Sequence, residues 1–189
     1  MFLAYLTASS DIFVPDMEKI FLMAEQKTID RNEFLLEQGQ ISQHKIFVVK
    51  GLLRNFSLSD EGNEHILQFN PENTWTLDVE SYDNGTPARF NISAVEKSEV
   101  LIWEKSDFNS LLEEIPAFRS LSQSIISRNI YSSRQRILTA ISATPEEKYT
   151  EFVSQNFELL SRLPLFMIAS YLGISLKTLT RVRRAQFQK

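Results

Sequence analysis

The middle of the chain contains short runs in which hydrophobic and polar residues alternate, separated by turn signals. Turn-forming residues follow these runs, as at Gln38-Gly39, Asp60–Asn63 and Asn70-Pro71. Alternation with a period of two is typical of strands that bury one face. At this spacing, between Lys27 and Trp103, the runs predict an antiparallel sandwich or barrel. The six runs are 33–37, 45–49, 53–58, 64–69, 90–95 and 99–103.

The segment from Asn73 to Ala88 interrupts this alternation. It contains three acidic residues beside an Asn84-Gly85 turn and leads into Arg89. We expect an irregular loop here. Because loops held by a regular β-scaffold are frequent ligand sites, this loop is the predicted place for a ligand.

Helices are predicted on both sides of the β-region. Pro15-Asp16-Met17-Glu18 and the apolar residues after it indicate a short helix. Ser106 is a suitable N-cap for a second helix, which ends before Pro116. A long helix is predicted from about Pro116 to Ala143.

The long helix has two apolar stripes. One stripe is enough to dock a helix on its own domain, and a second requires another neighbour. The same helix of a second subunit supplies that neighbour most simply, so we expect a homodimer. Arg128, Arg134 and Arg136 lie between the apolar positions, so the predicted dimer seam contains charged as well as apolar residues. The stripes are Phe118, Leu121 and Ile125, and Ile126 and Ile130 resumed by Ile137 and Ile141.

A new helix is predicted at Thr144. The sequence Thr144-Pro145-Glu146-Glu147 has the pattern of a capping box with proline at the first helical position. The long helix must therefore end before it, and Thr144 is the predicted start of a separate domain.

The segment Ile168–Gln186 combines two short helical patterns with a glycine between them. Ile168, Ala169 and Leu172 lead into Gly173, and a second, basic helix starts at Ser175. Two helices joined by a tight glycine turn, the second carrying cations, are typical of a helix-turn-helix that enters the major groove of DNA.

Charge is distributed unevenly in a way that supports DNA binding. Residues 159–189 contain six basic residues, Lys189 among them, and no acidic one, whereas the remainder holds 14 basic and 24 acidic residues. The net charge of −4 therefore hides a positive C-terminal segment that can neutralise phosphates.

Composition excludes several other classes. There is no cysteine, so thiolate metal sites and iron–sulfur clusters are excluded. No apolar run approaches the roughly 20 residues that span a bilayer, and the start MFLAYLTASS lacks a basic leader. We expect a cytoplasmic protein with no membrane partner.

Two histidines 21 residues apart and no G-x-S-x-G leave a cupin-like enzyme or a hydrolase a remote alternative, so no metal, cofactor or catalytic residue is expected.

Three strings resemble the Crp/Fnr family of bacterial transcription regulators. They are FVVKGLLRNFSLSDEGNEHILQF from Phe47, FNISAVEKSEVLIWEKSDFNSLLEEIPAF from Phe90 and IASYLGISLKTLTRVRR from Ile168. They look closest to the branch common in Bacteroidetes-type genomes. The resemblance implies an α+β fold with an N-terminal antiparallel β-roll, a jelly roll of the cyclic-nucleotide-binding type with flanking helices. It implies a sensor domain over 1–115, a dimerisation helix over 116–143 and an all-α helix-turn-helix domain over 144–189.

The resemblance also assigns roles within the C-terminal motif. Ser175 starts the recognition helix, Leu176 and Lys177 take the base-contacting positions, Thr178 is a phosphate-facing hydroxyl, and Arg181 is the basic residue one turn further on. Leu176 departs from the polar residue common there, and either contacts a thymine methyl or packs. The remaining expected DNA contacts are Thr180, Arg183 and Arg184, and the expected structural positions are Ile168, Ala169, Leu172, Gly173, Ile174, Leu179 and Val182.

The ligand-binding side departs from the family members that bind cyclic AMP. The Gly-Glu pair is replaced in Trp75-Thr76-Leu77-Asp78, and Ala88 falls at the phosphate-binding arginine. A pocket lacking those groups and containing acidic residues holds a phosphate poorly. We expect no cyclic AMP binding, and either an unknown small-molecule effector or none. The possible pocket residues are Trp75, Asp78, Glu80, Arg89 and Phe90.

A last departure concerns the residues after the recognition helix. Only five residues follow Arg184, so we expect the β-wing of the family to be absent. The implied partners are double-stranded DNA with a palindromic operator, a second copy of the chain and RNA polymerase. The main alternative is an effector-binding or interaction module whose helix-turn-helix is weak or non-functional.

Overall fold

The computed structural model describes residues 1–187, apart from the side chain of Phe187. The chain divides into two compact units. The first comprises residues 1–57 and 67–126, and the second comprises 58–66 and 127–189. The long helix α5 (Pro116–Ser142) belongs to the first unit up to Ile126 and to the second from Ser127.

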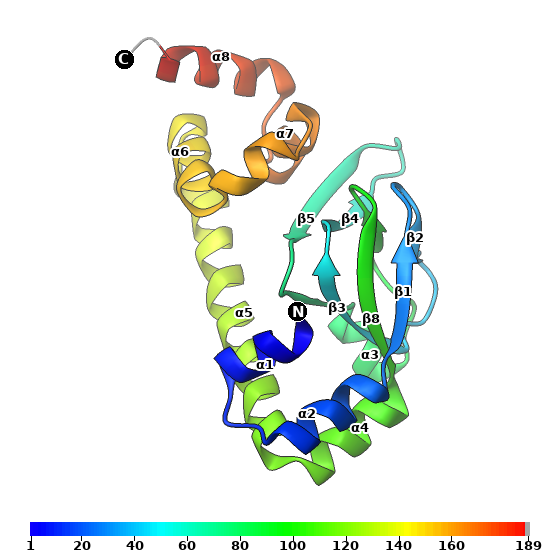
Figure 1. Ribbon diagram of the computed structural model, residues 1–189. Coiled ribbons are helices and arrows are strands. Elements are labelled where there is room, and N and C mark those ends of the chain that lie inside the picture. The colour runs from blue at the N-terminus through cyan, green and yellow to red at the C-terminus, as the bar shows by residue number, and fades with distance from the viewer. Residues whose placement is uncertain (188–189) are drawn as a thin grey trace. The chain divides into compact units, whose positions relative to one another are not determined.

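The first unit is built on eight strands in two antiparallel sheets (Figure 1). One sheet has the order β1-β8-β3-β6 and the other the order β2-β7-β4-β5. The strands are β1 (Glu25–Ile29), β2 (Phe34–Leu36), β3 (His44–Lys50), β4 (Leu53–Leu58), β5 (Glu64–Asn70), β6 (Trp75–Thr76), β7 (Asn91–Ala94) and β8 (Ser98–Glu104). The predicted α+β class with an N-terminal β-roll is confirmed, and all six predicted runs are strands.

Alternation along β3 and β8 gives the first sheet two apolar faces. Val48 and Val100 contribute to a core shared with β2, β4 and β7 of the second sheet. Phe47 and Trp103 face a second core built with helices. Those helices are α1 (Phe2–Ser9), α2 (Val14–Leu22), α4 (Lys105–Glu114) and the start of α5.

Two segments of the β-region differ from prediction. The expected irregular loop 73–88 contains β6 and the helix α3 (Val79–Asn84), a single helix of six residues that is too short to show periodicity. The strand β1 was not among the predicted runs, because only Ile29 of its five residues is buried and the alternation is missing.

The predicted N-cap at Ser106 is wrong. The helix α4 begins one residue earlier, at Lys105, directly after β8. The Lys105 backbone N–H donates to the carbonyl of Gln43 at 2.9 Å, so a neighbouring chain segment satisfies the helix start without a side-chain cap. The helix α1 was also missed, although its Phe2 and Leu6 are buried in the helical core.

The second unit is helical apart from the hairpin tip 58–66. After α5 it contains α6 (Pro145–Gln155), a 3₁₀ helix (Phe157–Ser161), α7 (Leu165–Leu172) and α8 (Leu176–Phe187). Figure 1 shows α6, α7 and α8 as neighbours, and each pair among them is in contact. Across residues 1–187 no single helix is long and apolar enough to cross a membrane, and α7 with α8 meets that test only as a pair bent by 102°.

Candidate nucleic-acid interface

A left-handed turn joins α7 to α8. Gly173 has φ +64°, and the Ile174 N–H donates to the Ala169 carbonyl at 3.1 Å, the six-to-one bond of a Schellman ending. A Cβ on Gly173 would meet no atom within 4 Å, so the glycine is needed for its backbone conformation and not for space.

Ser175 caps the start of α8. Its Oγ accepts a hydrogen bond from the Thr178 N–H at 3.1 Å and lies 2.9 Å from the Thr178 Oγ1. The Thr180 Oγ1 donates to the Leu176 carbonyl at 2.8 Å. All three predicted hydroxyl contacts therefore also have bonding partners inside the helix, and their first role is to hold its initial turns.

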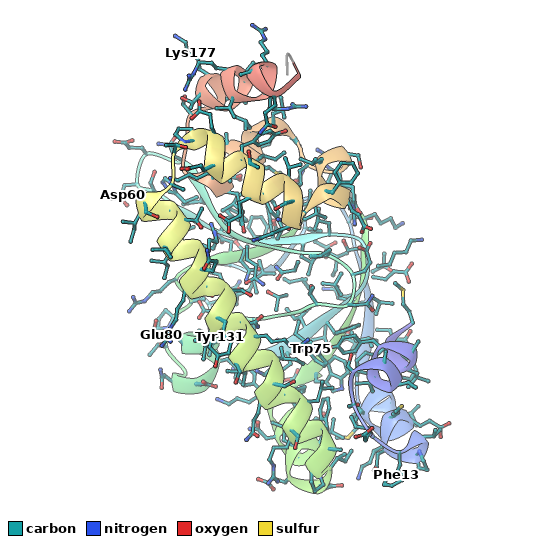
Figure 2. All side chains as sticks on the ribbon, turned by 90° about the vertical axis from the view of Figure 1, so that its left-hand side faces the viewer. Phe13, Asp60, Trp75, Glu80, Tyr131 and Lys177 are labelled. Carbon is teal, nitrogen blue, oxygen red and sulfur yellow. The ribbon has the colours of Figure 1, made fainter. Side chains whose placement is uncertain are left out.

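Apolar residues fix how α8 is rotated. Leu179 and Val182 are fully buried, and Ile168, Ala169 and Leu172 of α7 are buried too, with Ile174 half-buried. Residues three apart lie on one face of a helix, so the burial of Leu179 and Val182 turns the opposite face outward. That outward face carries exposed Leu176, Lys177, Arg181 and Arg184. Figure 2 shows Lys177 at the surface of α8.

The cations of α8 do not have equal surroundings. Arg181 Nη2 lies 3.3 Å from Glu146 Oε1 of α6, with the two side chains 68% and 50% exposed. Among residues 1–187, no ion pair involves Lys177, Arg183 or Arg184, and the buried Nε of Arg183 has no hydrogen-bond partner there. Lys189, counted in the basic segment, lies outside the described residues.

The predicted capping box at the start of α6 is confirmed. The Thr144 Oγ1 accepts from the Glu147 N–H at 3.3 Å, and the Glu147 carboxylate accepts from the Thr144 N–H at 2.8 Å. Hydrogen bonds from the Thr144 backbone and then from its side chain lower the pKa of Glu147. The box fixes the first turn of α6, which carries Glu146.

A second polar cluster in this unit was not predicted. The Ser170 Oγ of α7 donates to the Glu64 carbonyl at 2.6 Å and accepts from the Ile66 N–H at 3.0 Å, at the hairpin tip 58–66. Arg136 Nη2 donates to the carbonyls of Ile66 and Tyr171 at 2.9 and 3.2 Å, and its guanidinium lies 4.0 Å from the centre of the Tyr171 ring. Burial lowers the pKa of Arg136. This arginine, which the sequence placed in the dimer seam, is a packing residue within its own unit.

The five possible effector residues have different surroundings. Asp78 is buried and caps α3, accepting from the Ser81 N–H and the Arg89 N–H at 3.1 Å each. Arg89 and Glu80 form an exposed ion pair at 3.1 Å. Trp75 belongs to the aromatic core and donates from Nε1 to the Tyr5 hydroxyl at 3.2 Å, and Phe90 is half-buried beside the roll interior. Figure 2 labels Trp75 and Glu80.

A hollow of about 290 Å³ lies elsewhere in the first unit. Its lining includes Phe2 and Phe21 from the N-terminal helices, Lys27 and Thr28 from β1, and Glu99 from β8. None of the five predicted effector residues contributes to it. The sequence contained no signal for this hollow, because α1 and β1 were not predicted.

The role of Asp78 leads to a stability prediction. We expect Asp78→Ala to lower the free energy of unfolding by about 1–3 kcal/mol. The backbone N–H groups of Ser81 and Arg89 would lose the buried carboxylate that accepts their hydrogen bonds. Glu80→Ala is the control, since its exposed ion pair contributes about 0–1 kcal/mol. Urea unfolding of both variants measures the difference. Equal losses for the two variants would contradict a capping role for Asp78.

Comparison with known proteins shows which proteins the chain resembles. Residues 26–115 match the cyclic nucleotide-binding domain. The chain is 27% identical to the transcriptional activator anr of Pseudomonas aeruginosa over 199 aligned positions, covering 95% of this chain and 78% of that protein. FixK2 of Bradyrhizobium japonicum has the same fold, with a TM-score of 0.76, 17% identity and coverage of 87% and 85% of the two chains.

A Crp/Fnr-family protein from Eubacterium rectale also has this fold, with a TM-score of 0.71 and 15% identity over 94% of this chain and 85% of that chain. The Bacteroidetes-type branch stays a prediction. The β-roll, the helix-turn-helix geometry and the relatives agree, and together they support the resemblance to Crp/Fnr-family regulators.

Proposed function

We propose that the protein is a DNA-binding transcription regulator that acts as a homodimer and uses its β-roll as a sensor domain. The observation that carries this proposal is the outward face of α8. Its cations lie opposite the buried residues Leu179 and Val182, in a segment without any acidic residue. A helix of this kind fits the major groove and neutralises phosphates at the groove edges.

Within this proposal the α8 residues divide by chemistry. Lys177 and Arg181 are placed one turn apart on the exposed face, and either can bond to guanine O6 and N7. Arg184 lies one turn beyond Arg181 and suits a phosphate contact. Leu176 is 47% exposed, which favours contact with a thymine methyl over packing within the chain. The expected absence of a β-wing concerns residues beyond Arg184, of which 188 and 189 lie outside the described residues, so it stays a prediction.

Apolar residues on α5 support the homodimer. From Ile130 onward the helix exposes large apolar side chains that its own unit leaves uncovered. Ile130 and Ile137 are seven residues apart and 47% and 58% exposed, and Ser133 and Ala140 occupy the positions between and after them. This seven-residue spacing matches that of heptad positions in a two-helix interface, which supports the proposed homodimer. Tyr131, Leu138 and Ile141 widen the apolar strip; Figure 2 labels Tyr131 on α5.

The other predicted properties enter the proposal without direct test. The regulator is cytoplasmic, has RNA polymerase as a further partner at its operator, and performs no catalysis. In the described part of the chain no group of three or more His, Cys, Asp or Glu residues is arranged to hold a metal ion.

DNA binding by α8 gives the first functional prediction. Arg181→Ala should weaken binding to a selected operator by about 1–3 kcal/mol, because a bidentate base contact is lost. The measurement is fluorescence anisotropy with duplexes recovered from a genomic DNA selection. Lys97→Ala, which removes an exposed cation from the β-roll, is the control and should leave the affinity unchanged. If selection yields no fragment preferred over random DNA, the protein is instead an interaction module with a non-functional helix-turn-helix.

The apolar seam of α5 gives the second functional prediction. The wild-type chain should be a dimer at micromolar concentration, and Ile137→Glu should convert it to monomer, since a carboxylate is placed at the centre of an apolar contact. Light scattering coupled to size exclusion measures the mass. Ser132→Glu adds the same charge at an exposed position of α5 that neighbours none of the strip residues at i±3 or i±4, and it should remain dimeric. A monomeric wild-type protein would contradict the homodimer.

The sensor domain gives the third functional prediction. Cyclic AMP should show no saturable binding in calorimetry at micromolar protein, because Ala88 offers no cationic donor at the expected phosphate position and Asp78 is committed to capping α3. A cyclic-AMP-dependent regulator of the same family serves as the positive control. Micromolar binding by this protein would overturn the prediction.

A further inference from the structure

The ion pair between Glu146 and Arg181 places a negative charge beside the exposed basic face of α8. Glu146 is the second residue of α6 and lies outside the acid-free segment 159–189. Its Oε1 is 3.3 Å from Arg181 Nη2, and both side chains are at least half exposed. The two charges therefore meet in solvent, at the surface through which α8 would contact DNA.

Two further contacts hold the helices that carry this pair. The capping box of Thr144 and Glu147 fixes the first turn of α6. Further along the two helices, Gln186 Nε2 of α8 donates to Thr150 Oγ1 of α6 at 2.8 Å. The two helices are thus held together at a second point, and Glu146 is kept within reach of Arg181.

The pair changes what Arg181 offers to DNA. A guanidinium has five N–H donors, and a single close contact through Nη2 leaves others available for a base edge. The Glu146 carboxylate offsets part of the positive charge of Arg181 that would attract a phosphate. Donors for guanine O6 and N7 are retained while the sequence-independent attraction is reduced.

We propose that Glu146 is a specificity-determining residue that acts through Arg181, suppressing non-specific phosphate binding while leaving the base contact intact. The inference rests on the proposed function, since it assumes that α8 binds DNA. It assigns to α6 a role beyond supporting the recognition helix. The matched control is Glu158, an exposed carboxylate of the same unit with no ion pair to α8 among the described residues.

The test is a double-mutant cycle on the full chain, with affinities for a selected operator and for random duplex measured between 50 and 200 mM salt, roughly the range over which phosphate contacts dominate. Glu146→Gln should tighten random-duplex binding about 5-fold and operator binding less, so the operator-to-random ratio falls. The salt slope for random duplex should steepen by about 1, as for one added phosphate contact. Glu158→Gln should change neither the ratio nor the slope beyond a small shift shared by both duplexes.

The arginine background separates a specific pair from general charge. In Arg181→Ala protein, Glu146→Gln should have no more effect than Glu158→Gln. An equal loss of discrimination in the presence and absence of Arg181, or an unchanged operator-to-random ratio in Glu146→Gln protein that melts like wild type, overturns the proposal while the proposed function stands. A wild-type protein that prefers no fragment over random DNA overturns both.

Discussion

The burial of Leu179 and Val182 is the constraint on which the candidate interface depends. Both side chains are fully buried, so α8 cannot rotate about its axis without exposing them. The rotation decides which residues face outward, and hence that Lys177, Arg181 and Arg184 share one exposed face. The left-handed turn at Gly173 sets the direction in which α8 leaves α7. Chemistry at the surface is thus determined by packing one layer below it.

Sequence patterns were sufficient for elements that repeat their signal over several residues. All six alternating runs are strands, the capping box at Thr144 forms as predicted, and the long helix runs from Pro116 to Ser142. The patterns failed where tertiary contacts replace local ones. The start of α4 is satisfied by the Gln43 carbonyl, so Ser106 is not its cap, and the edge strand β1 buries only Ile29. Asp78 also shows this limit. An aspartate in a predicted loop looks the same in the sequence whether it binds a ligand or caps a helix.

The composition of the interface could be predicted, but its pairing could not. Charge segregation and the glycine turn indicated the basic helix directly. The partner of Arg181 comes from α6, 35 residues earlier, and no periodicity connects them. Arg136 shows the same limit, because its helical spacing indicated the dimer seam, whereas the structure gives it two carbonyls and the Tyr171 ring. A long side chain such as arginine can reach several neighbouring elements, so its position in the sequence does not predict which of them it contacts.

Paired and unpaired cations on one helix have a consequence for assembly. If one of the exposed cations of α8 is largely neutralised by its neighbour, a single copy gains less phosphate attraction than its sequence suggests, and the acidic remainder of the chain adds repulsion. One α8 helix would then hold duplex DNA weakly. In the proposed homodimer, the link through α5 would make the second half-site contact intramolecular, so the discrimination of each half-site would multiply without a new contact to DNA. The proposed dimer contact on α5 and the proposed charge reduction on α8 are therefore complementary. Weak half-sites would make binding depend on the dimer, and a dimer of weak half-sites would bind only where both recognise their sequence.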